Sequence, residues 1–209
     1  MYSQNEEEKY ILEYFDREYM KAHLSDGKGS FISIGENDGI TLSNVRALAE
    51  RGWIGIMVEP SPAAFAKLKD NYKGKEGFYF YNFALGTKNG MVPMWDSGTH
   101  LNKGDTGLLS TLSEDDKMKW SATTQFTEIK VQCFRWKTFL NRLKIKAFDF
   151  ISIDAEGLDY DILSQIDLSH TSCVCVEFNG DANLKIKFDR LMTGFRLIYT
   201  SSENLIYGR

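Results

Sequence analysis

The chain has 209 residues, of which 43% are hydrophobic and 26% charged, and its net charge at pH 7 is −4. This composition predicts a soluble globular protein with a substantial core. The slight negative charge disfavours a nucleic-acid partner, because such partners usually require a basic face. No apolar run is long enough to span a bilayer, and the polar, acidic N-terminus does not resemble a signal peptide. We therefore expect a cytoplasmic protein without a membrane partner.

Three cysteines form no disulfide framework, which favours reduced thiols and a cytosolic setting. Cys173 and Cys175 are two residues apart, so they face the same side of a predicted strand. No His or further Cys lies close to them in sequence. We expect buried core residues rather than metal ligands.

The first half of the chain alternates helical and extended patterns. Apolar residues at helical spacing predict an amphipathic helix over residues 6–24. A helix between Gly39 and Gly52 and another that begins at Pro62 are also predicted. The extended segments are 30–34, 53–59 and 77–85.

The segment 93–126 differs from the rest, since Trp95, His100 and Trp120 lie among Gly, Ser and charged residues. We expect a short strand near 91–95, a long loop, and a strand near 127–133. Loops of this length are usually functional lids or disordered. The alternation then resumes, with helices over 135–143, 158–166 and 183–193, strands over 148–154 and 173–179, and a closing hairpin of 194–200 and 204–208.

Strands that alternate with helices predict an α/β fold, in which a mostly parallel sheet has helices on both faces. Ligands bind such sheets outside the carboxyl ends of the strands. Polar residues follow five of the predicted strands, at 35–39, 59–61, 82–84, 154–157 and 177–179. These segments are the candidates for a binding site.

The first of these loops, Gly35-Glu36-Asn37-Asp38-Gly39, allows a sharp turn and a close approach to a ligand. Glu59 ends the next strand, where a carboxylate can accept hydrogen bonds from ribose hydroxyls. The loop lacks the dinucleotide and P-loop signatures, and its acidic residues would repel a pyrophosphate. It suits S-adenosylmethionine, which carries an ammonium and a sulfonium. The alternative is a plain strand-to-helix turn with solvated acids.

Six stretches resemble the FkbM family of class I methyltransferases: FISIGENDGITLSNVRAL, GIMVEPSPAAFAKLKDNY, NFALGTKNG, GLLSTL, FDFISIDAEGLDYDIL and VCVEFN. They cover roughly residues 30–180. The resemblance implies a Rossmann-like sheet of seven strands with an antiparallel last strand. It also implies S-adenosylmethionine as methyl donor and, usually, O-methylation of a hydroxyl on a sugar or natural product. An N-terminal helix (1–29) would precede the methyltransferase domain (30–209), with a substrate loop inserted at about 93–126.

The resemblance also implies roles for single residues. Gly35, Asn37 and Gly39 would shape the methionine side of the pocket, and Glu36 or Asp38 would meet the ammonium. Ser61 and Phe83 would border the adenine, unless Ser61 only caps a helix and Phe83 belongs to the core. The expected cofactor-binding residues are Gly35, Glu36, Asn37, Asp38, Gly39, Glu59, Pro60, Ser61, Asn82, Phe83 and Asp154.

Methyl transfer from a sulfonium requires alignment of the acceptor and exclusion of water, and an alcohol acceptor gains from a general base. The candidates are Asp154, Glu156, Glu177 and His100. Asp154 comes first because it would stand near the sulfonium; the alternative is a hydrogen-bonded carboxylate that only braces its loop. Asp154 and Glu156 could share a divalent cation, but no further ligands can be identified, and no metal site is predicted. Trp95 and Trp120 would line a sugar site or anchor the loop.

Two positions depart from the family pattern. Glu36 stands where the family commonly has Ala, and Ser152 stands where it commonly has Lys, so the acceptor and the acid–base chemistry stay open. O-methylation of a small-molecule or glycan acceptor is the leading function. A non-catalytic S-adenosylmethionine-binding or regulatory protein of the same fold is the alternative, and a nicotinamide oxidoreductase is a weaker third. The sequence leaves the oligomeric state open.

Overall fold

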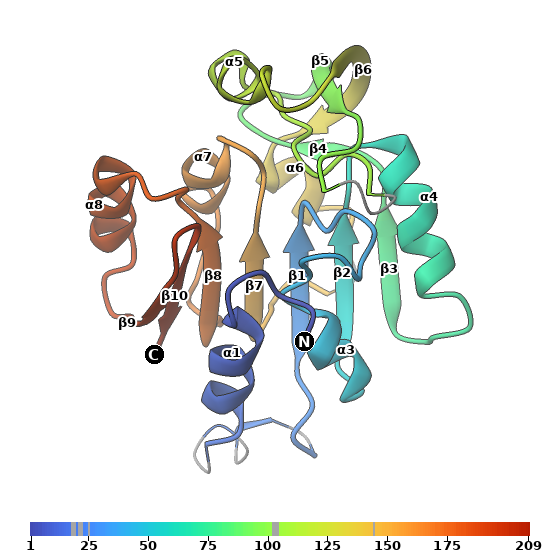
Figure 1. Ribbon diagram of the computed structural model, residues 1–209. Helices are drawn as coiled ribbons and strands as arrows, with labels where there is room; N and C mark the ends of the chain where they lie inside the picture. Colours follow the sequence, from blue (N-terminus) through green and yellow to red (C-terminus); the bar gives the residue numbers. More distant parts are fainter. Residues whose placement is uncertain (18–19, 21–22, 25, 102–104, 144) are drawn as a thin grey trace.

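The computed structural model describes residues 1–17, 20, 23–24, 26–101, 105–143 and 145–209. A seven-stranded sheet forms its centre, in the order β3-β2-β1-β7-β8-β10-β9 (Figure 1). Its strands are β1 (Ser30–Ile34), β2 (Ile54–Val58), β3 (Phe78–Tyr81), β7 (Phe150–Ile153), β8 (Cys173–Glu177), β9 (Arg196–Thr200) and β10 (Asn204–Gly208). β10 runs antiparallel to both of its neighbours, whereas the pairs from β3 to β8 are parallel. The predicted mixed sheet with an antiparallel last strand is confirmed.

Helices cover both faces of this sheet, as the alternating pattern predicted. Successive strand residues point to opposite faces, so Phe31 packs in one core cluster while Ile32 packs in the other. The Phe31 face is covered by α1 (Glu7–Phe15), α3 (Arg46–Glu50) and α4 (Pro62–Asn71). The Ile32 face is covered by α6 (Trp136–Leu140), α7 (Asp159–Leu163) and α8 (Ala182–Leu191).

Several predicted boundaries were wrong. The helix predicted over 6–24 ends at Phe15, and the later part of that range lies partly outside the described residues. The helix expected directly after Gly39 begins only at Arg46, because Asp38 and Ser43 first bond the backbone of intervening turns. The strand predicted over 77–85 is broken at Asn82, whose side chain bonds the carbonyls of Glu59 and Pro60.

The residues after this break belong to a second sheet. Strands near 91–95 and 127–133 were predicted, but their pairing into a separate sheet was not. It consists of β4 (Ala84–Leu85), β5 (Gly90–Ser97) and β6 (Phe126–Phe134), in the order β4-β6-β5. The segment predicted as a long loop also contains α5 (Glu114–Trp120), whose N-terminus is capped by Ser113. In Figure 1 the second sheet and α5 lie above the carboxyl ends of the central strands. This arrangement closes the edge at which ligands are expected.

The cysteines behave as predicted. All three are free and buried, and Cys173 and Cys175 pack on the face of β8 that is turned toward α1. Within the described residues, no helix combines the length and the apolar character that crossing a membrane requires.

Candidate active site

A cavity lies between the carboxyl ends of the central strands and the second sheet. The space within it is about 1330 Å³, including the open solvent at its mouth. Its walls come from the loops after β1, β2, β7 and β8 and from the segment between β5 and β6; Gln4 and Glu203 add to them. The polar segments that the sequence placed at the strand ends therefore meet around one space.

Gly35 shows why the first loop begins with glycine. Its φ is +80°, and a Cβ atom there would lie 1.7 Å from the carbonyl oxygen of Asp154. The loops that follow β1 and β7 are therefore in backbone contact. Gly39 has a φ of +75°, but its missing Cβ makes room for the side chains of Leu68 and Tyr72. Gly39 lies outside the cavity wall, and its observed role is packing.

Glu59 organises the loop beside it. Its Oε2 accepts a hydrogen bond from the Asn37 backbone N–H at 2.8 Å, and its Oε1 accepts one from the Ser61 N–H at 2.7 Å. A carboxylate has about four acceptor sites, so roughly two remain for a ligand. Burial raises the pKa of Glu59 to about 8, while these two backbone bonds act in the opposite direction.

The two acids of the first loop are placed differently. Glu36 is buried in the cavity wall, where it accepts hydrogen bonds from Ser33 Oγ at 2.5 Å and Ser43 Oγ at 2.6 Å. Burial raises its pKa to about 7, and the two hydroxyl bonds oppose the shift. Asp38 instead accepts bonds from the N–H groups of Ile40 and Thr41 and lies outside the wall. Of the two acids, only Glu36 faces the cavity.

Pro60 and Phe83 line the cavity, whereas Ser61 and Asn82 do not. Phe83 also packs against the core rings of Phe134 and Phe139, so its two suggested roles are compatible. Ser61 precedes α4 but makes no side-chain cap bond, and its buried Oγ has no partner. Ser61 therefore occupies the N-cap position that the alternative expected, but without the side-chain bond of a cap.

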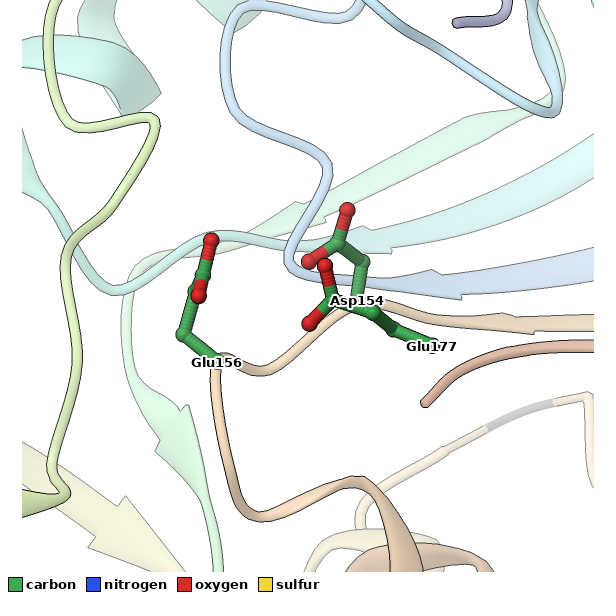
Figure 2. Close-up of side chains that lie close together, drawn as sticks. All are labelled: Asp154, Glu156 and Glu177. Atoms are coloured by element: carbon green, nitrogen blue, oxygen red, sulfur yellow. The ribbon is translucent and has the colours of Figure 1, made fainter. Parts of the chain in front are cut away.

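Three carboxylates converge at the ends of β7 and β8. Figure 2 shows Asp154 and Glu177 beside each other, with Glu156 facing them from the loop after β7. One oxygen of each lies within 4.8 Å of the others. Burial raises the pKa of Asp154 to about 7, and the nearby charge of Glu36 adds to this. The pKa values of Glu156 and Glu177 lie well above the ordinary range, first because of burial and then because of the neighbouring carboxylates.

Asp159 shapes this loop, a role that the sequence did not reveal. Its carboxylate accepts hydrogen bonds from the N–H groups of Ala155 at 2.9 Å and Gly157 at 3.1 Å. Two such bonds hold the turn in which Glu156 adopts a φ of +44°. In the first turn of α7, Asp159 is also placed where a negative charge is favoured. The sequence feature that could have revealed this role is the position of Asp159, five residues after Asp154 and at the start of a helix. A side chain there can reach back to the preceding loop.

The segment between β5 and β6 supplies aromatic residues to the wall. His100 and Trp120 both line the cavity, with ring centroids 6.0 Å apart in an edge-to-face arrangement. Their buried Nδ1 and Nε1 atoms have no hydrogen-bond partner. Trp95 lies outside the wall, and the Lys117 ammonium sits 3.4 Å from its ring centroid. Trp95 thus anchors α5 and does not face the cavity.

Thr111 joins this segment to the carboxylate loop. Its Oγ1 donates a 2.6 Å hydrogen bond to the Glu156 carbonyl. A Cβ atom on Gly157 would lie 1.9 Å from Asp116 Oδ2, so α5 packs directly on the loop. Thr111 lies within the GLLSTL stretch, although no role was predicted for it.

The cavity has a strongly acidic wall. Among the described residues that line it, none is Lys or Arg, and six are acidic: Glu36, Glu59, Asp154, Glu156, Glu177 and Glu203. Buried acceptor atoms of the wall also lack partners, among them Oδ1 of Asn37 and Oδ1 of Asn44. S-adenosylmethionine fits this set of groups, because its ammonium, ribose hydroxyls and sulfonium supply donors and positive charge. A pyrophosphate cofactor does not fit it.

The match to one family model agrees with this assignment. The model of the methyltransferase FkbM domain matches residues 33–196. Similar structures include the N-terminal domain of human METTL16 in complex with SAH (13% identity, 97% of this chain and 69% of that chain, TM-score 0.48). Another is a ribosomal protein L11 methylase from Lactobacillus delbrueckii subsp. bulgaricus (14%, 96% and 77%, TM-score 0.46). No curated protein matches the sequence.

The family match spans well over half of the chain. It covers the first loop from Ser33, the Glu59 strand end, the second sheet and the carboxylate cluster. The nicotinamide alternative is overturned, since neither the loop nor the acidic wall suits that cofactor. The chain belongs to the FkbM family of S-adenosylmethionine-dependent methyltransferases.

Proposed function

We propose that the chain O-methylates a hydroxyl of a sugar or small natural product. The observation that carries this proposal is the position of Asp154, a carboxylate with a pKa of about 7 that lines the cavity beside the cofactor loop. A general base works best when its pKa lies near the operating pH. The acidic wall, without Lys or Arg among the described residues that form it, disfavours a nucleic-acid acceptor.

The cofactor supplies a methyl group on a positively charged sulfur that is a good leaving group. In our proposal, Glu59 accepts hydrogen bonds from the ribose hydroxyls with the acceptor sites that Asn37 and Ser61 leave free. Glu36 faces the ammonium, and Phe83 borders the adenine. The close contact between Gly35 and Asp154 keeps the cofactor loop and the carboxylate in a fixed relation.

Asp154 orients the acceptor hydroxyl and takes its proton. In methyl transfer the hydroxyl oxygen would bond to the methyl carbon while the carbon–sulfur bond breaks, and the bond electrons would stay on sulfur as a neutral thioether. The alcohol proton passes to Asp154. Because α5 and the second sheet cover this edge, we propose that the segment 93–126 shields the acceptor and that His100 and Trp120 contact it.

Asp154→Asn tests the proposal, because asparagine keeps the shape but cannot take a proton. Turnover of an accepted hydroxyl substrate should fall by about 10²–10⁴-fold, while S-adenosylhomocysteine affinity stays close to that of the wild type. The matched control is Asp161→Asn on the exposed side of α7, which should leave both unchanged. Normal turnover in Asp154→Asn together with an inactive His100→Ala would place the base on the covering segment instead.

A screen with glycans, small alcohols and proteins separates catalysis from the non-catalytic alternative. Methyl transfer to a hydroxyl-bearing acceptor supports an enzyme. Cofactor binding without transfer to any acceptor supports a binding or regulatory protein of the same fold.

A further inference from the structure

The cluster of Asp154, Glu156 and Glu177 has a feature that proton transfer alone does not require. Two of its members come from the loop after β7 and one from the end of β8. These strands are neighbours in the sheet, so their carboxyl ends point to the same place (Figure 2). One base needs one carboxylate, yet three oxygens from three residues lie within 4.8 Å of one another.

The buried atoms of this cluster also lack partners. Glu156 and Glu177 are each only 7% exposed, and neither Oε2 atom has a hydrogen-bond partner. Within the described part of the chain, no ion pair neutralises either residue. Lys119, the positive charge that lowers their pKa values, lies 4.7 Å from the centroid of the Trp120 ring. A buried carboxylate oxygen without a donor is costly unless a ligand supplies the missing interaction.

We propose that Asp154, Glu156 and Glu177 bind a divalent cation of the oxygen-preferring class, such as Mg²⁺, Mn²⁺ or Ca²⁺. All three donors are carboxylate oxygens, which suit these cations rather than zinc. Two oxygens on opposite sides of Ca²⁺ are about 4.6–5.2 Å apart, and those around Mg²⁺ are up to about 4.2 Å apart. Separations of up to 4.8 Å therefore fit Ca²⁺ directly and fit Mg²⁺ after small side-chain movements.

Three protein oxygens leave several coordination positions open. This consequence rests on the proposed function: the open positions would take two adjacent oxygens of the acceptor, such as those of a vicinal diol or a hydroxy acid. A cation favours the deprotonated form of a hydroxyl that it contacts. The hydroxyl proton would still pass to a carboxylate oxygen that does not face the cation. The inference therefore narrows the acceptor class to compounds with neighbouring oxygens.

Calorimetric titration with MnCl₂, MgCl₂ or CaCl₂ alone, without cofactor or acceptor, tests the site. We expect one cation per wild-type chain. Glu177→Gln, which removes one charged ligand, should weaken binding by about tenfold or more. The control is Glu203→Gln, which removes a carboxylate from the same cavity wall but outside the cluster. It should bind the cation with nearly wild-type affinity.

The melting temperature, measured with and without cation, distinguishes a lost binding site from a misfolded variant. The cation should raise the melting temperature of the wild type and of Glu203→Gln, but not that of Glu177→Gln. Absence of binding at millimolar cation, or equal losses in both variants, overturns the proposal. Methyl transfer that persists in EDTA without cation binding overturns the cation site and leaves the proposed function intact. Stoichiometric cation binding without methyl transfer to any hydroxyl supports the cation site and overturns the proposed function.

Discussion

Replacing Glu59 by glutamine separates the two tasks that we assign to this side chain. The carboxyl group, which is neutral at pH 5 because burial raises its pKa to about 8, holds the N–H groups of Asn37 and Ser61 with one oxygen each. Glutamine keeps one acceptor oxygen but turns an NH₂ group toward the other N–H. A buried donor left without a partner costs about 1–3 kcal/mol, so the free energy of unfolding should fall by about that amount at pH 5.

This loss should shrink as the pH rises. Burial raises the pKa of Glu59 from 4.5 to about 8 in the folded protein. The folded state therefore binds more protons than the unfolded state between these values, and wild-type stability falls as pH rises through that window. The shift corresponds to at most about 5 kcal/mol, at about 1.36 kcal/mol per pKa unit. Glutamine releases no proton, so the variant lacks this part of the decline.

Urea unfolding from pH 5 to pH 9 measures both effects, and titration with S-adenosylhomocysteine measures the binding task. Glu59→Gln should weaken binding by about 1–3 kcal/mol through the lost ribose hydrogen bonds. Glu76→Gln, at an exposed glutamate before β3, is the control and should change neither quantity. Unchanged affinity in a folded Glu59→Gln variant would refute the ribose assignment. A stability difference that does not vary with pH would show that Glu59 does not titrate in this range.

Three further outcomes are expected. His100→Ala should raise the KM for the acceptor while S-adenosylmethionine affinity, measured by calorimetry, stays unchanged; a parallel loss of both would contradict the acceptor role. The melting temperature of the cofactor-free protein should fall between pH 5 and pH 8, and fall less in Glu36→Gln, because burial raises the Glu36 pKa to about 7 and protonation stabilises the folded state below that pH. Gly157→Ala should destabilise the protein by about 1–3 kcal/mol and speed proteolysis within α5, because its Cβ would meet Asp116. Gly74→Ala, which has a similar positive φ in open space, measures the backbone strain alone, and equal effects in both would contradict the packing argument.

The positions of the main strands along the chain, and the residues at their ends, could be predicted from the sequence because both follow from local patterns. Gly35 and Asp154 were placed correctly at the ends of β1 and β7. The convergence of Asp154 with Glu177 was harder to predict from the sequence, since it depends on which strands become neighbours in the sheet. The break at Asn82 was missed for a related reason. An apolar run indicates burial, but it does not reveal where a chain leaves one sheet for another.

The helix α5 was missed although its signals are present. Ser113 occupies the N-cap, three acids follow in the first turn, and lysines lie in the last turn, a pattern typical of a helix. The surrounding Gly and Ser residues favoured a loop over the whole segment. Glu36 and Asp38 show the remaining limit. Both precede the same helix, and only the three-dimensional path of the turn decides that Glu36 alone faces the cavity.

The contact between Gly35 and Asp154 also has a consequence for folding. The two strands that carry them pair directly, yet their ends lie about 120 residues apart along the chain. Contacts between such distant residues form late and slow the folding of a chain, because a large loop must close first. The first loop and Asp154 therefore come together only when β7 docks beside β1, and the carboxylate cluster forms only when β8 docks beside β7. A fragment that ends before β7 should fail to bind S-adenosylhomocysteine, and the cofactor should accelerate folding little while slowing unfolding, since its binding surface exists only in the completed sheet.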